Sequence, residues 1–130
     1  MIGFLASSAS GYLALFSVFA TVALAYVLRQ RRATLRPHEL FGYAILFVVL
    51  AHAMLAMTSG ISLRGGSAGL APASVALLLV VLQVSLGQSL TAARAGRATL
   101  RRFHFATMAA IVGLSLLHAY LNGALLRALL

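Results

Sequence analysis

The sequence predicts an all-α integral membrane protein, a four-helix bundle whose two termini lie outside the membrane. Three observations predict this class: 62% of the 130 residues are hydrophobic, only 8% are charged, and the charged residues lie between long apolar runs. Soluble domains carry about 25% charged residues, and the mean hydropathy here is +1.03. The composition excludes a soluble globular domain, a disordered chain and a nucleic-acid-binding module, in spite of a net charge of +9.

Four apolar runs are each long enough to cross a hydrocarbon core of about 30 Å as a helix, and they lie at about residues 10–28, 38–58, 72–93 and 103–122. No basic residue precedes the first run, so we expect a helix inserted with its N-terminus outside rather than a cleaved signal peptide. The second and third begin near Pro37 and Pro72, and proline suits a first helical turn. The fourth follows an arginine-rich segment. The four spans use nearly the whole chain, which predicts a single transmembrane domain over residues 1–130.

The placement of arginine predicts the orientation of these helices. All ten basic residues are arginine, and the first and third connections hold most of them: Arg29, Arg31, Arg32, Arg36, Arg94, Arg97, Arg101 and Arg102. The second connection holds only Arg64, and the C-terminal segment holds only Arg127. By the positive-inside rule, the first and third connections face the cytoplasm. We therefore expect a multi-pass protein of a bacterial-type inner (cytoplasmic) membrane.

A short repeat indicates that the bundle consists of two similar halves. The sequence Arg-Ala-Thr-Leu-Arg occurs at residues 32–36 and again at residues 97–101. Each copy closes one expected helix and precedes a helix that carries histidine. The first two helices therefore resemble a unit that the last two repeat, with the pseudo-symmetry axis along the membrane normal.

All four histidines lie in the second and fourth expected spans. His38 and His52 are fourteen residues apart, and so are His104 and His118. Fourteen residues are two heptads, so both histidines of one helix face the same seam, about 21 Å apart along the axis. Since both helices run from inside to outside, we expect His38 to lie opposite His104 and His52 opposite His118.

Two imidazoles on facing helices are the ligand pair of a bis-histidine haem, in which iron has no open position and favours electron transfer. The spacing predicts two haem b groups, with His38 and His104 on the inner iron and His52 and His118 on the outer iron. The chain has no cysteine, which excludes iron–sulfur clusters and covalent haem attachment. The competing interpretations are a zinc or copper site, for which two histidines per site are too few ligands, and histidines that serve helix packing or a proton relay.

The pairs of histidines on the second and fourth helices resemble the di-haem b-type cytochromes. This family includes the haem-bearing core of cytochrome b in quinol-oxidising complexes, bacterial di-haem cytochromes b and ferric-reductase-like membrane domains. The resemblance covers the four spans, and it implies that His38, His52, His104 and His118 are the haem ligands. The sequence has no tryptophan, hence no Pro-Glu-Trp-Tyr quinol-site segment, and no nucleotide-binding domain. The resemblance therefore extends to the haem core and not to the substrate chemistry.

Two glycines and two glutamines are candidates to complete the predicted cofactor sites. Gly42 and Gly113 lie near His38 and His118 in the sequence, where a small residue lets a flat macrocycle approach the backbone. Small residues also serve ordinary helix packing in membranes. Gln83 and Gln88, in the third span, are candidates to hydrogen-bond an imidazole or simply another helix.

Three arginines lie close to the inner pair of histidines. Arg36, Arg101 and Arg102 are each within three residues of His38 or His104. They are candidates to bind the propionates of the inner haem through bidentate hydrogen bonds. Membrane topology alone also places arginine at this depth, so both interpretations stay open.

The predicted function is electron transfer across the membrane through two bis-histidine haems, with no catalytic residue of its own. The expected partners are membrane lipid and either quinone or redox protein subunits, within a larger membrane complex or a homo-oligomer; no nucleic acid is expected. The alternative is a cofactor-free membrane scaffold or a small transporter subunit, in which the histidines serve packing or proton relay.

Overall fold

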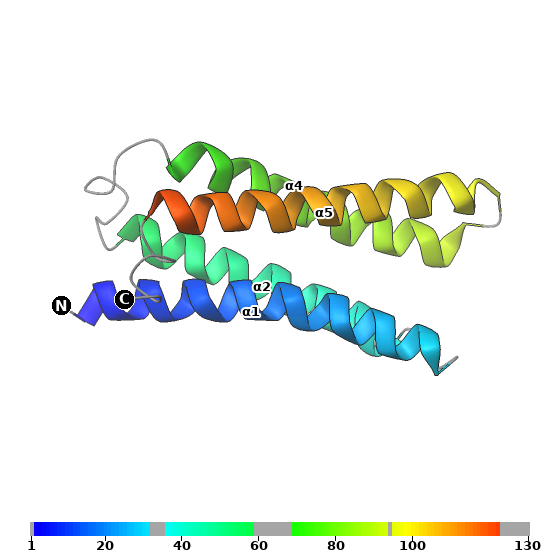
Figure 1. The fold of residues 1–130 in the computed structure, drawn as a ribbon, viewed down its shortest axis with the longest axis horizontal. Coiled ribbons are helices and arrows are strands. Elements are labelled where there is room, and N and C mark those ends of the chain that lie inside the picture. The colour runs from blue at the N-terminus through cyan, green and yellow to red at the C-terminus, as the bar shows by residue number, and fades with distance from the viewer. Residues whose placement is uncertain (1, 32–35, 59–68, 94, 123–130) are drawn as a thin grey trace. The chain divides into compact units, whose positions relative to one another are not determined.

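The computed structural model describes residues 2–31, 36–58, 69–93 and 95–122. It contains four α-helices: α1 (Ile2–Gln30), α2 (Arg36–Thr58), α4 (Leu70–Ala92) and α5 (Arg97–Leu121) (Figure 1). Each of the four is long and apolar enough to cross a membrane. The predicted all-α, four-helix arrangement is therefore confirmed, and the four candidate spans indicate a multi-pass membrane protein.

Two of the helices begin earlier than the apolar runs indicate. Helix α1 begins at Ile2 rather than near residue 10, and α5 begins at Arg97 rather than at residue 103. Alanine, leucine and arginine are all good helix formers, so the helical backbone continues past the residues that are apolar enough for hydrocarbon. Hydropathy predicts the spanning part of a helix and not its whole length.

The hydroxyl side chains within the helices bond to the backbone of their own helix. Ser17 donates to the carbonyl of Leu13 at 2.7 Å, and Ser89 donates to the carbonyl of Ser85 at 2.9 Å. A bilayer core offers no water to satisfy such groups. These internal hydrogen bonds therefore make the hydroxyls compatible with membrane-spanning helices.

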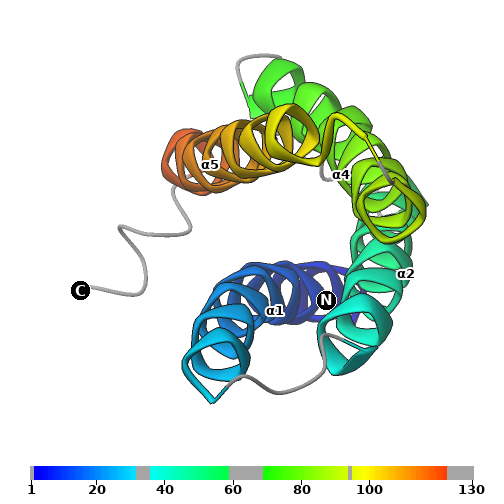
Figure 2. The same cartoon turned by 90° about the vertical axis from the view of Figure 1, so that its right-hand side faces the viewer.

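The helices pack in two pairs that belong to two compact units, Met1–Ile61 and Ser62–Leu130. We call α1 with α2 the first hairpin and α4 with α5 the second hairpin. Viewed along the helices, each pair lies side by side (Figure 2). Each hairpin is described by itself, and the single domain over residues 1–130 stays a prediction.

Small and β-branched side chains form the buried contacts within each hairpin. In the first hairpin these are Ala14, Val18 and Thr21 of α1 and Ile45 of α2. The corresponding set in the second hairpin is Pro72, Ala76, Val80 and Ile111. Membrane helices approach closely through small residues, because lipid provides no hydrophobic force that drives helices together. Helix packing in both hairpins follows this rule.

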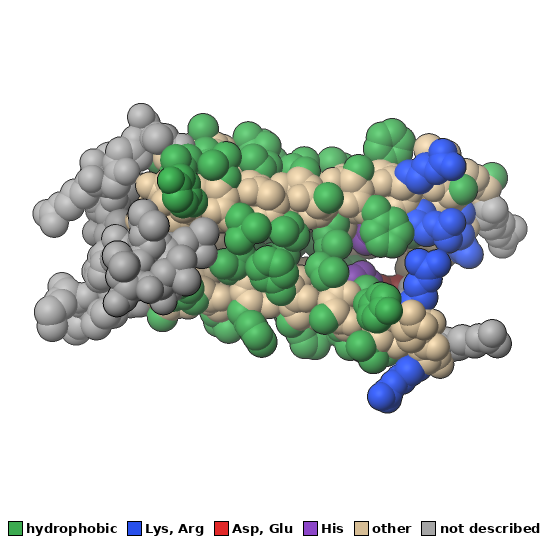
Figure 3. All heavy atoms as spheres, viewed as in Figure 1, with side chains coloured by type: hydrophobic (Ala, Val, Ile, Leu, Met, Phe, Trp, Pro, Cys, Tyr) green, Lys and Arg blue, Asp and Glu red, His purple; other side chains and the backbone are tan. Residues whose placement is uncertain are grey.

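The large apolar side chains point outward from both hairpins. Phe16 is 71% exposed and Phe47 is 74% exposed in the first hairpin, and Leu78 is 70% exposed in the second. Apolar side chains accordingly cover the length of the helices in Figure 3. Water would not tolerate so much exposed apolar surface on a soluble domain, whereas lipid acyl chains are its natural solvent.

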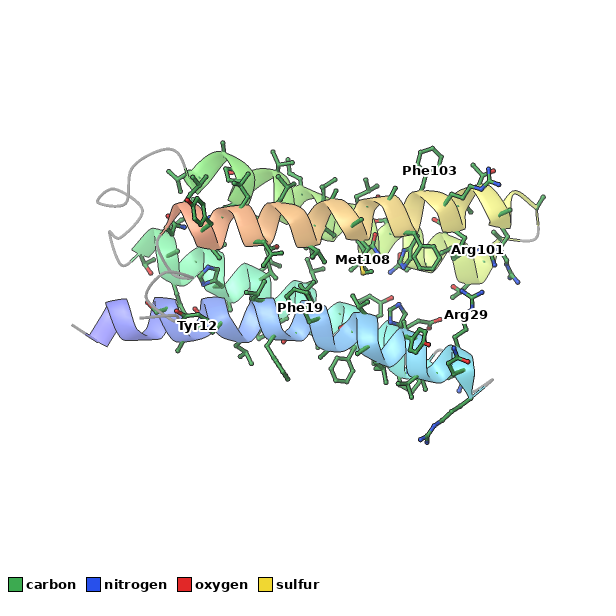
Figure 4. All side chains as sticks on the ribbon, in the orientation of Figure 1. Tyr12, Phe19, Arg29, Arg101, Phe103 and Met108 are labelled. Carbon is green, nitrogen blue, oxygen red and sulfur yellow. The ribbon has the colours of Figure 1, made fainter. Side chains whose placement is uncertain are left out.

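The arginines lie at the connected ends of the hairpins, as Figure 4 shows for Arg29 at the end of α1 and Arg101 near the start of α5. Arg97, Arg101 and Arg102 all lie in the first two turns of α5. The helix dipole disfavours cations at a helix N-terminus, so local helix energetics does not account for them. The preference of arginine for the cytoplasmic side does.

The two hairpins share one register, in which residues 66 positions apart play the same part. Ala14 and Val80 are both buried, and so are Ile45 and Ile111. His38 and His104 are related by the same offset, as are His52 and His118. This correspondence extends the short sequence repeat to the packed face of each hairpin.

Candidate functional site

One seam of α2 carries both histidines of the first hairpin. His38, Ile45 and His52 follow each other at intervals of seven residues, so they lie on one face of the helix. Ile45 is only 8% exposed, and both histidines are half-buried and contact α1. The sequence prediction that the two histidines share a seam therefore agrees with the geometry of this hairpin.

His52 packs where α1 presents its smallest side chains. The hydroxyl Oγ of Ser10 lies 3.0 Å from His52 Nδ1. A Cβ atom added to Gly11 would lie 3.1 Å from His52 Cε1, which is tighter than an ordinary contact. Glycine at residue 11 is what lets the imidazole lie this close to the backbone of α1.

His38 contacts α1 nearer the connected end of the hairpin. Its ring is hydrogen-bonded to the backbone of Thr21. Its Nδ1 atom is buried and makes no hydrogen bond within the part of the chain that the structure describes. Glu39, the only acidic residue of the chain, follows in the first turn of α2, where a negative charge suits the helix dipole.

His104 occupies the same position in the second hairpin and contacts α4. The amide Nε2 of Gln83 lies 3.2 Å from His104 Nε2, so one of the two glutamines expected near an imidazole lies beside one. A Cβ atom added to Gly87 would lie 3.8 Å from His104 Cε1, an ordinary contact distance. The Nδ1 atom of His104 is buried without a hydrogen bond among the described residues.

His118 joins the end of α5 to the beginning of α4. Its Nδ1 lies 2.8 Å from the carbonyl oxygen of Gly69, the residue that caps the N-terminus of α4. The amide Nδ2 of Asn122 lies 3.1 Å from Nδ1 and 3.2 Å from Nε2 of the same ring. A Cβ atom on Gly69 would come within 2.6 Å of Asn122 Oδ1, so this three-residue cluster depends on glycine.

The glycines that contact imidazoles differ from the two that the sequence singles out. At Gly42 and Gly113 an added Cβ would meet nothing within 4 Å, and neither glycine lies against a histidine of its hairpin. Gly11, Gly69 and Gly87 lie against histidines or their partners. A role for Gly42 and Gly113 toward a macrocycle stays a prediction.

The arginines predicted to bind propionates are exposed to the surroundings of the hairpins. Arg36 lies at the start of α2, and Arg101 and Arg102 lie near the start of α5, all three exposed. Arg32, Arg64, Arg94 and Arg127 lie outside the described residues. Exposed guanidinium groups at this position are available to anionic groups, and the pairing with propionates stays a prediction.

The four imidazoles form a donor set that suits haem iron more than a small metal-ion site. Across residues 2–31, 36–58, 69–93 and 95–122, no three side chains of His, Cys, Asp or Glu lie together as a metal site. Each hairpin instead presents two separate imidazoles, flanked by small residues, among apolar helices. Such residues fit two bis-histidine irons that take one ligand from each hairpin. The pairing of the two hairpins stays a prediction.

Sequence reasoning missed two partners of the histidines. Ser10 and Gly69 carry no motif, and they become neighbours of His52 and His118 only through the register of each hairpin. Comparison of the chain with protein-family models, curated protein sequences and solved structures finds no match. The geometry of the hairpins and the chemistry of their side chains are therefore the basis of a functional assignment.

Proposed function

We propose that the chain is a b-type cytochrome of a bacterial-type inner membrane that carries electrons between two haem b groups. One observation supports this most: both hairpins have the same seam, with histidines at its ends and a buried isoleucine midway, His38–Ile45–His52 and His104–Ile111–His118. Packing alone does not require two polar rings at equal spacing in each of two hairpins. Ligation of two irons at two depths requires this spacing.

In this proposal the imidazoles hold the irons and the surrounding side chains set their environment. His38 and His104 hold the inner iron, and His52 and His118 hold the outer iron. Haem iron with two imidazole ligands supplies one-electron transfer without an open coordination position. The apolar helices exclude water, while Arg36, Arg101 and Arg102 neutralise the inner propionates.

The orientation and the partners are part of the same proposal. Arginine at the connected ends of both hairpins favours a cytoplasmic location for those ends and an outside location for both termini. The chain then exchanges electrons with quinone or with redox subunits in a larger complex or a homo-oligomer. Membrane lipid covers the exposed apolar side chains.

Haem analysis of the purified chain tests the proposal. We expect about two haems per chain by pyridine haemochrome analysis, and a sharp α-band after reduction. The variant His38→Ala with His52→Ala, which removes both ligands of the first hairpin, serves as the control and should lose both haems. A correctly folded wild-type chain that shows no Soret absorption after haem is supplied would contradict the proposal.

A second candidate function is favoured by the hydrogen bonds of the histidines. Each ring has a partner within its own hairpin, such as Ser10 for His52 or Gln83 for His104. Histidines satisfied in this way suit a cofactor-free scaffold or a small transporter subunit. In that case the haem analysis is negative, and removal of a histidine destabilises the hairpin to which it belongs.

A further inference from the structure

The second hairpin places a carboxamide against the Nε2 atom of each of its histidines. Gln83 Nε2 lies 3.2 Å from His104 Nε2, and Asn122 Nδ2 lies 3.2 Å from His118 Nε2. A carboxamide nitrogen donates hydrogen bonds and does not accept them. The imidazole Nε2 must therefore accept, and a neutral ring that accepts at Nε2 carries its proton on Nδ1.

For His118 a second contact leads to the same protonation state. The Gly69 carbonyl oxygen, 2.8 Å from His118 Nδ1, can only accept a hydrogen bond, so Nδ1 must donate. With Nδ1 donating to Gly69, the amide of Asn122 is left to donate to Nε2. The two partners thus agree on one tautomer, and each satisfies a different nitrogen.

The first hairpin carries no carboxamide at the corresponding positions. The residues 66 positions before Gln83 and Asn122 are Ser17 and Ala56. The contact of His52 Nδ1 is to the hydroxyl of Ser10, which both donates and accepts. A hydroxyl is compatible with either tautomer, so the carboxamide contacts distinguish the second hairpin.

We infer that Gln83 and Asn122 are positioning residues that keep His104 and His118 as neutral rings with the proton on Nδ1, which reserves Nε2 as the ligating nitrogen. The role of Nε2 toward iron rests on the proposed function, whereas the tautomer does not. When iron binds, the amide N–H moves away from Nε2 and no proton has to leave the ring. The carbonyl of Gly69 stays on Nδ1 of His118, where it orients the ring and raises its basicity as a ligand.

Nitrogen NMR of the haem-free chain tests the inference. The full chain is labelled with ¹⁵N-histidine in detergent micelles, and the signals are assigned from His104→Ala and His118→Ala. We expect both rings of the second hairpin to show the single Nδ1–H pattern. Gln83→Leu should convert His104 alone to a mixed pattern, and Asn122→Leu should move the Nε2 shift of His118 alone.

The matched control is Gln88→Leu, which removes an exposed carboxamide from the same helix and should leave all four histidine patterns unchanged. A proton on Nε2 of His104 or His118 in the unaltered chain would overturn the inference, and this measurement does not depend on whether the leucine variants fold. An unchanged His104 pattern in folded Gln83→Leu would overturn the role of Gln83.

Haem loading separates failure of this inference from failure of the proposed function. A chain that shows Nδ1–H rings but binds no haem supports the tautomer assignment and contradicts the cytochrome. A chain that binds two haems but carries the proton on Nε2 in the second hairpin does the reverse. If both proposals hold, Gln83→Leu changes the low-spin electron paramagnetic resonance signal of one haem, and Asn122→Leu changes the other.

Discussion

In the first hairpin, the hydroxyl of Ser10 contacts His52, whereas in the second the carbonyl of Gly69 and the amide of Asn122 contact His118. The residue 66 positions after Ser10 is Ala76, which has no polar group to offer. The second hairpin therefore satisfies the same imidazole from the end of the partner helix. The shared register determines where a histidine lies, and the local sequence determines which group bonds it.

The inner histidines show the same difference. His38 bonds to the backbone at Thr21, and the residue 66 positions later is Gly87, which leaves His104 to the side chain of Gln83. A membrane interior is costly for any unsatisfied polar group, so each hairpin needs a partner for each ring. The two hairpins meet this need independently.

The largest expected effect is the loss of a whole haem. If the hairpins contribute one ligand each to both irons, His38→Ala and His104→Ala should remove the same haem, and His52→Ala and His118→Ala the other. Redox titration of each variant with optical detection identifies the haem that remains. A shared spectral loss in His38→Ala and His118→Ala would show that the hairpins do not pair at matching depth.

The next effect is an all-or-none difference in labelling. Because both hairpins carry arginine at their connected ends, we expect cysteine at Arg31 and at Gly96 to be protected from an impermeant thiol reagent in intact cells. Cysteine at Gly66, in the second connection, should react. The natural chain has no cysteine and provides the blank. Labelling of only one of the two connected ends would mean that the hairpins have opposite orientations.

A moderate loss of stability is expected from a substitution that affects only the second hairpin. Gly96 has a φ of 70°, a left-handed conformation that costs other residues about 1–2 kcal/mol. We expect Gly96→Ala to lower the free energy of unfolding by this amount in mixed detergent micelles. Gly42→Ala is the control, because an added Cβ there meets nothing within 4 Å. Equal stability of the two variants would remove the conformational argument.

The smallest effect compares two glycines that contact histidines. An added Cβ at Gly11 would lie 3.1 Å from the ring of His52, against 3.8 Å between Gly87 and the ring of His104. Alanine gains up to about 1 kcal/mol over glycine within a helix. We expect Gly87→Ala to keep this gain and Gly11→Ala to lose most of it, because His52 must shift. Denaturation curves of both variants measure the difference, and a larger gain for Gly11→Ala would contradict the close packing.

The sequence predicts the four helices well because hydropathy and arginine placement act over whole segments. It also predicts that the two histidines of a helix share a seam, since a spacing of fourteen residues is a local property of helices. Gln83 is identified as a candidate because carboxamides are rare in this chain. Each of these predictions depends on one segment at a time.

The partners supplied across a hairpin are harder to predict. Which residue of α1 faces His52 depends on how far the helices extend past the apolar runs, and α1 begins near Ile2 rather than Ser10. Ser10 and Gly69 are common residue types with no periodicity of their own. Gly42 and Gly113 are close to histidines along the chain, but the residues across the hairpin are the ones that touch the rings.

The constant offset of 66 residues has a consequence for the origin of the chain. Tandem duplication of a gene for one hairpin leaves such an offset, and a single-hairpin ancestor would assemble as a two-fold symmetric pair of identical subunits. In such a pair every partner of a histidine would be present twice. After fusion the two copies could diverge separately, so Gln83 and Asn122 could arise in one copy alone. Differences between the two halves then record changes that a symmetric ancestor could not have made in one subunit only.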